Sequence, residues 1–161
     1  MCDAGTTLAL SDWGCMDYEE ALKKQLEWVE KISMKQASDT LALVEHPPVY
    51  TIGKRAGAEG NLRWSREQLT ASGISLARST RGGDITYHGP GQLVVYPLID
   101  LSGKKDLHTW LRMLEQVVID ALAKYSLSGT RRDGMTGIWI ENRKIAAIGV
   151  AVRKWVVYHG F

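Results

Sequence analysis

The segment from Arg81 to Gln92 carries the residue types of this sequence that are best suited to binding a polar substrate. It holds four glycines and one proline among charged, hydroxyl and aromatic residues, and it begins Arg81, Gly82, Gly83, Asp84, Ile85, Thr86, Tyr87 and His88. Glycine lets a backbone approach a ligand closely or adopt a positive φ. The segment has neither the Gly-Lys-Ser/Thr ending of a phosphate-binding loop nor the dinucleotide fingerprint. It therefore indicates a substrate-binding loop, with a tight polar connection as the alternative.

Lys144 is the second position where the surrounding pattern favours chemistry. It begins a run expected to form a strand over residues 144–153, and every second residue shares its face: Ala146, Ile148, Val150 and Val152. An ammonium at the end of an apolar face loses part of its hydration, so it can hold a neighbouring thiol as thiolate or protonate a leaving group. Small residues on the other face leave room for a packed helix or for an acyl chain: Ala147, Gly149 and Ala151. The alternative for Lys144 is a solvated hairpin residue.

The elements that would position these residues are mainly strands. We expect strands over residues 6–13, 40–45, 49–52, 74–78, 92–100, 138–140, 144–153 and 155–158, and helices over 18–33, 65–72 and 107–125. Asp17 is expected to cap the first helix, and Ser65 with Gln68 forms a capping box for the second. Residues 92–100 are apolar on both faces, which is typical of a strand in the middle of a sheet. Glycine-rich loops are expected over 53–61, 81–91 and 129–137.

The fold class follows from the order of these elements. Because strands outnumber helices and hairpin-like connections mix with helical ones, the sequence predicts an α+β fold with a mixed, mostly antiparallel sheet and packed helices. Its 161 residues are the size of one domain and contain no repeat or linker, so a single domain is expected over 1–161. No apolar run approaches membrane-spanning length and the N-terminus has no signal pattern, so we expect a cytoplasmic protein without a membrane partner.

The charge pattern gives little support for nucleic acid as a partner. The net charge is only +2, and the sequence has no basic helix or known nucleic-acid module. The basic residues bunch at Lys54, Arg55, Arg63 and Arg66, at Arg78 and Arg81, at Arg131 and Arg132, and at Arg143 and Lys144. These bunches are either solvated surface or a footprint for an acidic protein partner. The histidines and cysteines have no metal-ligand spacing, so no metal is expected.

Five stretches of the sequence resemble the octanoyltransferases, the lipoate-protein ligase B family. The longest is RGGDITYHGPGQLVVYPLIDL from Arg81, which is specific in length and residue types. The others occur in the order found in the family: DWGCMDYEEALKKQ from Asp12, EHPPVYTIGKR from Glu45, KIAAIGV from Lys144 and HGF from His159. The resemblance spans essentially the whole chain.

This resemblance implies the fold of the biotin and lipoate ligases and a defined reaction. Members of the family take an octanoyl group from the phosphopantetheine thioester of acyl carrier protein and place it on a lysine, in lipoate biosynthesis. A cysteine thiolate attacks the thioester, and the target lysine then attacks the acyl-enzyme. The transfer needs no ATP and no cofactor. The implied partners are octanoyl-acyl carrier protein and the lipoyl domains of 2-oxoacid dehydrogenase complexes and of the glycine cleavage H protein.

The resemblance also assigns roles to residues. Lys144 takes the position of the catalytic lysine. Substrate contacts fall on Arg81, Gly82, Gly83, Asp84, Ile85, Thr86, Tyr87 and His88, on Ala147, Ile148 and Gly149, and on Gly160 and Phe161. We expect glycine amides to donate to the thioester oxyanion. His88 and His159 are expected in the pocket, His46 at a turn or near the pocket, and His108 at the surface.

This sequence lacks the nucleophilic cysteine of the family's pattern. The family carries it beyond the segment that begins HGF, and this sequence ends at Phe161. Cys15 stands where the family places no catalytic cysteine, and Cys2 lies at the N-terminus, so both are expected to be ordinary reduced thiols. We therefore expect the C-terminal part of the domain to be missing and the chain alone to be weak or inactive; a shortened homologue that binds without acylating is the alternative.

Two other functions stay open on the sequence. One is an ATP-dependent lipoate or biotin-type ligase of the same fold, because a glycine-rich loop and a lysine also suit acyl-adenylate chemistry. The other is a non-catalytic module that binds acyl carrier protein or lipoyl domains.

Overall fold

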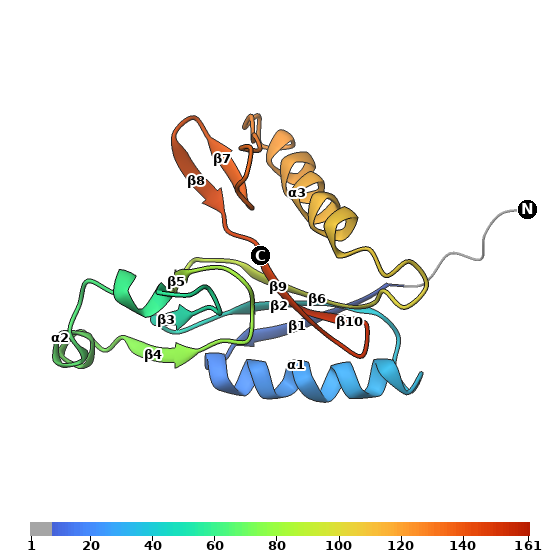
Figure 1. Ribbon diagram of the computed structural model, residues 1–161, viewed down its shortest axis with the longest axis horizontal. Helices are drawn as coiled ribbons and strands as arrows, with labels where there is room; N and C mark the ends of the chain where they lie inside the picture. The colour runs from blue at the N-terminus through green and yellow to red at the C-terminus, as the bar shows by residue number, and fades with distance from the viewer. Residues whose placement is uncertain (1–7) are drawn as a thin grey trace, which may run out of the picture.

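A five-stranded sheet forms the central layer of the molecule, with the strand order β1-β2-β6-β10-β9 (Figure 1). The computed structural model describes residues 8–161. Of the neighbours in this sheet, β1 and β2 are parallel and the other pairs are antiparallel. The strand bounds are β1 (Ala9–Cys15), β2 (Thr40–Glu45), β6 (Val94–Asp100), β9 (Gly149–Arg153) and β10 (Val156–Gly160). The predicted mixed, mostly antiparallel architecture is confirmed.

Helix α1 (Tyr18–Ser33) covers one face of this sheet (Figure 1). Its buried residues recur at helical spacing, and Val29 and Ile32 belong to the same apolar core as Val156 of β10. The predicted bounds of this helix are confirmed. Asp17 is the N-cap residue, as predicted, although its side chain makes no cap hydrogen bond.

Strand β6 lies between β2 and β10, and helix α3 (Leu107–Ala123) covers the face of the sheet opposite α1 (Figure 1). The strand is buried from Val94 to Leu98, as expected for a central strand that is apolar on both faces. On the α3 side, Trp110 and Leu114 pack with Val157 of β10. Strand β6 therefore lies between the layers formed by α1 and α3.

A second, three-stranded sheet lies at one end of the molecule, with the order β4-β3-β5 (Figure 1). It consists of β3 (Val49–Ile52), β4 (Ser75–Arg78) and β5 (Ile85–His88), with the short helices η1 (Ala58–Asn61) and α2 (Arg66–Ala71) between β3 and β4. The predicted capping box of Ser65 and Gln68 is confirmed. The prediction of a loop over residues 81–91 is wrong for β5, because backbone pairing with β3 makes Ile85–His88 a strand.

The third sheet is a hairpin of β7 (Ile138–Ile140) and β8 (Arg143–Ala146), which lies beside α3 (Figure 1). The sequence predicted one strand over residues 144–153, and this prediction is wrong. The chain leaves the hairpin at Ala147–Ile148 and enters the central sheet as β9. Lys144 therefore belongs to a different sheet from Val150 and Val152, and the shared face predicted for them does not exist.

No helix within residues 8–161 has the length and apolar character needed to cross a membrane. The first strand begins at Ala9 in the structure, and both Cys2 and Thr6, for which the sequence made predictions, lie outside the described residues.

Candidate functional site

The first part of the glycine-rich segment lies directly against the start of β9. The amide of Gly82 donates to the carbonyl of Val150 at 3.0 Å. A Cβ added at Gly149 would lie 2.9 Å from the carbonyl oxygen of Gly82 and 3.3 Å from Cδ of Arg81. Two of the predicted groups of substrate contacts, residues 81–84 and 147–149, are therefore brought together, and their close approach requires glycine at 149.

The guanidinium of Arg81 is buried beneath this junction. Its Nη2 donates to both the carbonyl and the hydroxyl oxygen of Thr51, each at 2.8 Å, and its Nη1 donates to the carbonyl of Gly82 at 3.1 Å. Within residues 8–161 it forms no ion pair with a carboxylate, and burial lowers its pKa from the usual value. Arg81 thus ties the segment to β3 through hydrogen bonds to neutral oxygens, and the carboxylate of Asp84 acts on it only from beyond ion-pair distance.

Strand β5 directs its side chains to two different places. Its backbone pairs Tyr87 with Tyr50, and the two rings lie 5.1 Å apart on the outer side, where Tyr87 is exposed. His88 points the other way, and its ring stacks on that of Tyr18 at 6.2 Å. Neighbouring residues of a strand face opposite sides, so of these two predicted contacts only His88 joins the buried polar side chains.

His46, His88, Tyr18 and Tyr96 form a cluster of rings between the two larger sheets. His46 is fully buried, and its ring lies 5.6 Å from the rings of Tyr18 and His88 and 5.9 Å from that of Tyr96. Burial lowers the pKa of His88 to about 4 and raises the pKa of Tyr96 above its usual value. His46 follows β2 directly and also lies in this cluster. We call these four residues the ring cluster.

His159 reaches this region through an unusual backbone conformation. Its φ is 57°, in the left-handed region that side chains other than glycine rarely adopt. Its ring lies 4.7 Å from that of Tyr158 and 6.3 Å from that of Tyr96, although neighbouring residues of a regular strand point to opposite faces. Left-handed backbone of this kind costs free energy and is concentrated at functional sites.

The hydrogen bonds of His159 leave one ring atom without a partner. Its amide donates to Oε1 of Gln25 at 2.7 Å, and its Nε2 lies 2.9 Å from the hydroxyl of Thr80. Its Nδ1 and the side-chain nitrogen of Gln25 are both buried without a partner in residues 8–161. Burial, followed by the nearby positive charges of Arg81 and Lys54, lowers the pKa of His159 to about 3, so the ring is neutral.

Gly160 and Phe161 continue β10 along the end of β6. Phe161 exchanges backbone hydrogen bonds with Val95, at 2.7 and 3.1 Å. A Cβ at Gly160 would lie 2.1 Å from the carbonyl oxygen of Val95, and Gly160 pairs with Gly149. The third group of predicted contacts therefore lies beside the second.

Lys144 projects from β8 over the loop that precedes β7. Its Nζ lies 4.8 Å from the centre of the Trp139 ring, and a Cβ at Gly137 would meet its Cε at 2.6 Å. The residue remains exposed, yet partial burial lowers its pKa. No carboxylate of residues 8–161 forms an ion pair with it. Four residues further on, Ile148 is buried against Trp110 of α3, while Ala147 just before it is exposed.

Several polar residues of this region were not singled out by sequence. Glu115 of α3 is buried, bonds to Arg112 at 2.7 Å and Arg131 at 3.1 Å, and accepts from the amide of Gly137 at 3.3 Å. Gln25 is buried in α1. Both residues are polar and lie next to the apolar stripe of a helix. Helical periodicity alone does not tell whether such a residue is buried or exposed.

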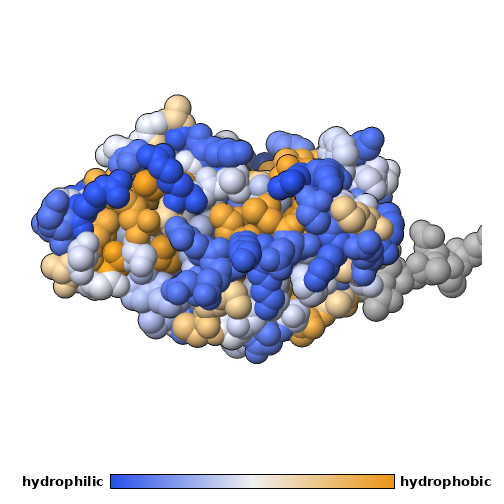
Figure 2. All heavy atoms as spheres, turned by 90° about the horizontal axis from the view of Figure 1, so that it is seen from below, coloured by the Kyte–Doolittle hydropathy of each residue, from blue (hydrophilic) through white to orange (hydrophobic). Residues whose placement is uncertain are grey.

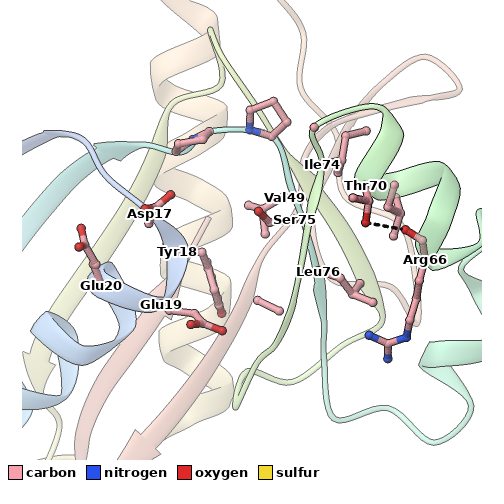
Figure 3. A pocket seen from close by; sticks show the side chains of 15 residues that line it. Asp17, Tyr18, Glu19, Glu20, Val49, Arg66, Thr70, Ile74, Ser75 and Leu76 are labelled. Atoms are coloured by element: carbon pink, nitrogen blue, oxygen red, sulfur yellow. Dashed lines mark hydrogen bonds between the residues drawn. The ribbon is translucent and has the colours of Figure 1, made fainter.

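A separate hollow of about 720 Å³ lies on the other side of Tyr18. Figure 3 shows Asp17, Glu19 and Glu20 on one side of it and Arg66, Thr70 and Leu76 on the other. Figure 2 shows apolar surface at this end of the molecule, bordered by polar side chains. None of the residues predicted to contact substrate lines the hollow. We therefore place the candidate site at the junction of Arg81, Gly149 and Gly160, where the predicted groups meet.

The remaining predicted positions lie apart from this junction. His108 is exposed at the start of α3, as predicted. Cys15 is exposed at the end of β1, and three strands separate β1 from β9. Within residues 8–161 no group of three His, Cys, Asp or Glu side chains is arranged to hold a metal ion.

Comparison with known proteins gives a consistent result. Residues 17–161 match the family described as the lipoyl protein ligase A/B catalytic domain. The chain is 44% identical to an octanoyltransferase of Geobacter metallireducens over 96% of its own length and 69% of that protein. It is 49% identical to an octanoyltransferase of Gloeobacter violaceus over 81% of its length and 57% of that protein.

Solved structures support the fold assignment. An archaeal bi-partite lipoate protein ligase from Thermoplasma acidophilum superposes with a TM-score of 0.68 at 22% identity, covering 96% of this chain and 61% of that one. A lipoate complex of LipL1 from P. falciparum gives a TM-score of 0.73 at 14% identity, covering 96% of this chain and 46% of that one. The expected biotin and lipoate ligase fold is thereby confirmed.

Proposed function

Because the chain belongs to the octanoyltransferase family of lipoyl protein ligase A/B catalytic domains, we propose that it transfers an octanoyl or lipoyl group from acyl carrier protein to a lysine of lipoyl domains. The acceptors are the lipoyl domains of 2-oxoacid dehydrogenase complexes and of the glycine cleavage H protein, in cytoplasmic lipoate biosynthesis. The reaction exchanges a thioester for an amide and passes through a cysteine thioester, so it requires no nucleotide.

The observation that carries this proposal is the junction of three chain segments. Gly82 bonds to Val150 of β9, Gly149 pairs with Gly160, and Phe161 bonds to Val95. These contacts bring the glycine-rich segment, the start of β9 and the end of β10 to one place. In the proposal, this place holds the thioester end of the acyl chain.

One backbone donor at this junction is free to bind a developing oxyanion. The amide of Gly82 already donates to the carbonyl of Val150, so this amide does not serve as the oxyanion donor that we expected among the glycines. The amide of Gly83 makes no hydrogen bond within residues 8–161, and its φ of 90° is in the range that favours glycine. We assign Gly83 as the donor, because preorganised amides stabilise the charge of a tetrahedral intermediate.

In the proposal, Lys144 holds the nucleophilic thiol as thiolate and protonates the leaving thiolate. Its lowered pKa supports this role, because partial burial brings an ammonium closer to the range where it donates a proton near neutral pH. An ammonium beside a thiol also favours the thiolate.

The proposal places the nucleophile outside these 161 residues. Cys15 is an exposed residue of β1, at the opposite edge of the central sheet from Gly149 of β9. Four strand spacings separate those edges, which is about 19 Å. The nucleophile is then a cysteine of the full-length protein, and this chain supplies the lysine and the walls of the acyl site.

The experiment that tests the proposal is intact-mass measurement after incubation with octanoyl-acyl carrier protein. The 161-residue chain, the full-length protein and its Lys144→Met variant are compared. We expect an octanoyl adduct on the full-length protein alone, formed about a hundredfold more slowly by Lys144→Met. The melting temperature of this variant should be unchanged, because Lys144 is exposed.

Other outcomes would count against the proposal. An adduct on the 161-residue chain at the full-length rate would overturn the assignment of the nucleophile. If the full-length protein gains no adduct but exchanges pyrophosphate into ATP in the presence of octanoate, the protein is an ATP-dependent ligase. Binding of acyl carrier protein with neither reaction would favour a non-catalytic module.

A further inference from the structure

The cations of this protein are concentrated beside the glycine-rich segment. Between Gly53 and Asp84 the sequence has six Lys and Arg residues against three Asp and Glu residues, so this stretch carries a net charge of +3. The whole chain carries +2, and the rest of the molecule is therefore slightly negative. An anionic partner is attracted to this end of the molecule rather than to the whole surface.

Backbone hydrogen bonds attach part of this basic stretch to the candidate acyl site. The amide of Lys54 donates to the carbonyl of Arg81, and the amide of Arg55 to that of Gly83, each at 3.0 Å. Further along, the side-chain nitrogen of Asn61 donates to both carboxylate oxygens of Asp84, at 2.8 and 2.9 Å. Lys54 and Asn61, which lies two residues before Arg63, are thereby attached to the segment proposed to contact substrate.

Ion pairs within the stretch neutralise some of these cations and leave others free. Glu59 lies 2.8 Å from Arg78 and 3.9 Å from Arg66, and Asp84 lies 3.3 Å from Arg55. Lys54 and Arg63 are exposed and form no ion pair within residues 8–161. These two cations remain available to a partner.

The second bunch of basic residues behaves differently. Arg131 bonds to Glu115 and Gln116, and Arg132 bonds to Asn142 and lies over the ring of Trp139. These side chains hold the loop before β7 in place. The structure thus separates a basic bunch with internal partners from one with free charges, which the sequence alone does not do.

Two features suggest a protein rather than a small anion as the occupant. Trp64 follows Arg63 directly and is 44% exposed, and aromatic residues with Arg are enriched in protein interfaces. Lys54 lies beside the candidate acyl site, because its amide bonds to the carbonyl of Arg81 at 3.0 Å. The free charges therefore extend from the acyl site to an exposed aromatic residue.

We propose that Lys54, Arg63 and Trp64 form the docking surface for the protein that delivers the acyl group, an acidic carrier protein whose thioester arm carries a phosphodiester. This inference rests on the proposed function, because that reaction requires such a donor. Electrostatic attraction of this kind raises the association rate and depends strongly on salt, whereas the chemical step is unaffected.

The test compares two acyl donors for the full-length protein: octanoyl-acyl carrier protein and octanoyl-N-acetylcysteamine, which lacks both the phosphate and the protein. The variants are Arg63→Glu and Lys54→Glu, and the control is Lys23→Glu, the same charge change at an exposed position of α1. We expect Arg63→Glu and Lys54→Glu each to raise the KM for the carrier protein about tenfold and to weaken its salt dependence. Lys23→Glu should change neither quantity, and all variants should use the small thioester like the unmodified protein.

Three results would overturn the docking surface. One is an equal KM for the carrier protein in Arg63→Glu and Lys23→Glu. Another is an increase in KM for the lipoyl-domain acceptor instead of the donor, which would assign the surface to the acceptor. The third is an equal loss with both donors, which would mean that the variants damage the acyl site.

Calorimetry with apo-acyl carrier protein separates this inference from the proposed function. If the protein transfers octanoyl from neither donor, the proposed function fails, but the carrier's Kd still shows whether Arg63→Glu weakens binding about tenfold relative to Lys23→Glu. Equal binding by these two variants removes the docking surface, whatever the activity.

Discussion

His46 and Tyr96 are joined by a buried hydrogen bond of 2.7 Å whose direction is fixed from the other side of the imidazole ring. There, Nδ1 lies 2.6 Å from the carbonyl oxygen of Met16, which can only accept, so Nδ1 carries the proton. Burial lowers the pKa of His46, and the ring is neutral at pH 7. Nε2 is then an acceptor, and the hydroxyl of Tyr96 donates to it.

Replacing Tyr96 by Phe should therefore destabilise the protein although the aromatic ring is kept. The substitution leaves Nε2 of His46 buried without a partner, which costs about 1–3 kcal/mol. Urea unfolding measures the loss. The matched control is Tyr125→Phe, since Tyr125 is 79% exposed and its hydroxyl makes no hydrogen bond within residues 8–161. Equal midpoints for the two variants would contradict the hydrogen bond as described.

The free energy of unfolding should decrease as the pH falls below 6.5, because two buried histidines stay neutral in the fold. Burial gives His159 a pKa of about 3 and His88 a pKa of about 4 in the fold, both below the usual value of 6.5 for histidine. Since the unfolded chain binds protons that the fold excludes, the stability is present above pH 6.5 and is lost as the pH falls. Each imidazole that stays neutral contributes a slope of about 1.4 kcal/mol per pH unit.

The variant His159→Asn tests this window. Asparagine tolerates the left-handed backbone at position 159 better than other side chains do. We expect the free energy of unfolding of this variant to change less steeply between pH 6.5 and 5.0, above the range in which most carboxyl groups titrate. His108→Asn, at an exposed position, should keep the full slope. If the free energy of unfolding depends equally on pH in the unmodified protein and in His159→Asn, then His159 does not stay neutral in the folded protein.

Gly53 should resist substitution because two loops meet at its backbone. A Cβ there would lie 2.3 Å from the carbonyl oxygen of Gly83 and 2.8 Å from Nη1 of Arg81. Gly53→Ala should cost about 2–3 kcal/mol by overpacking and should slow acylation, because the glycine-rich segment proposed to contact substrate must move. Gly60→Ala is the control, since a Cβ at Gly60 meets nothing within 4 Å. Melting temperatures and acylation rates that do not distinguish the two variants would disprove the close approach.

Local signals in the sequence predicted the elements that depend on local physics. The bounds of α1, β2 and β3 and the capping box at Ser65 follow from helical spacing, strand propensity and capping chemistry, and the structure has them as predicted. The strand Ile85–His88 was missed because its flanking glycines and proline indicate a loop. Its stability comes from pairing with β3, which is distant in sequence.

The error at Lys144 has a different cause. Apolar alternation continues through residues 144–153, and periodicity does not register that the chain changes sheets at Ala147–Ile148. The ring cluster was only partly predictable for a related reason. His46, Tyr18 and Tyr96 come from three distant segments, and tertiary contact between α1 and the central sheet brings them together.

The support beneath Lys144 gives the last prediction. Glu115 holds Arg112, Arg131 and the amide of Gly137 at once, and a Cβ at Gly137 would already touch Lys144. Glu115→Gln keeps the size of the side chain but removes the charge, so it leaves two cations beside a buried amide. We expect a loss of about 3 kcal/mol, because breaking a buried pair from one side leaves its partner charges uncompensated.

The position of Lys144 should change in the same variant. Once the loop over residues 131–137 loosens, the lysine gains hydration, its pKa rises toward the usual value, and its ammonium stabilises the nucleophilic thiolate less. Acylation then slows most at neutral pH, where less of the thiol is ionised, and recovers partly at higher pH. Hydrogen exchange of residues 131–146 and the pH dependence of adduct formation by the full-length protein measure the two effects. Glu27→Gln, an exposed residue of α1, should change neither. A variant that unfolds more easily but keeps its pH profile would show that Glu115 stabilises the fold without positioning the lysine.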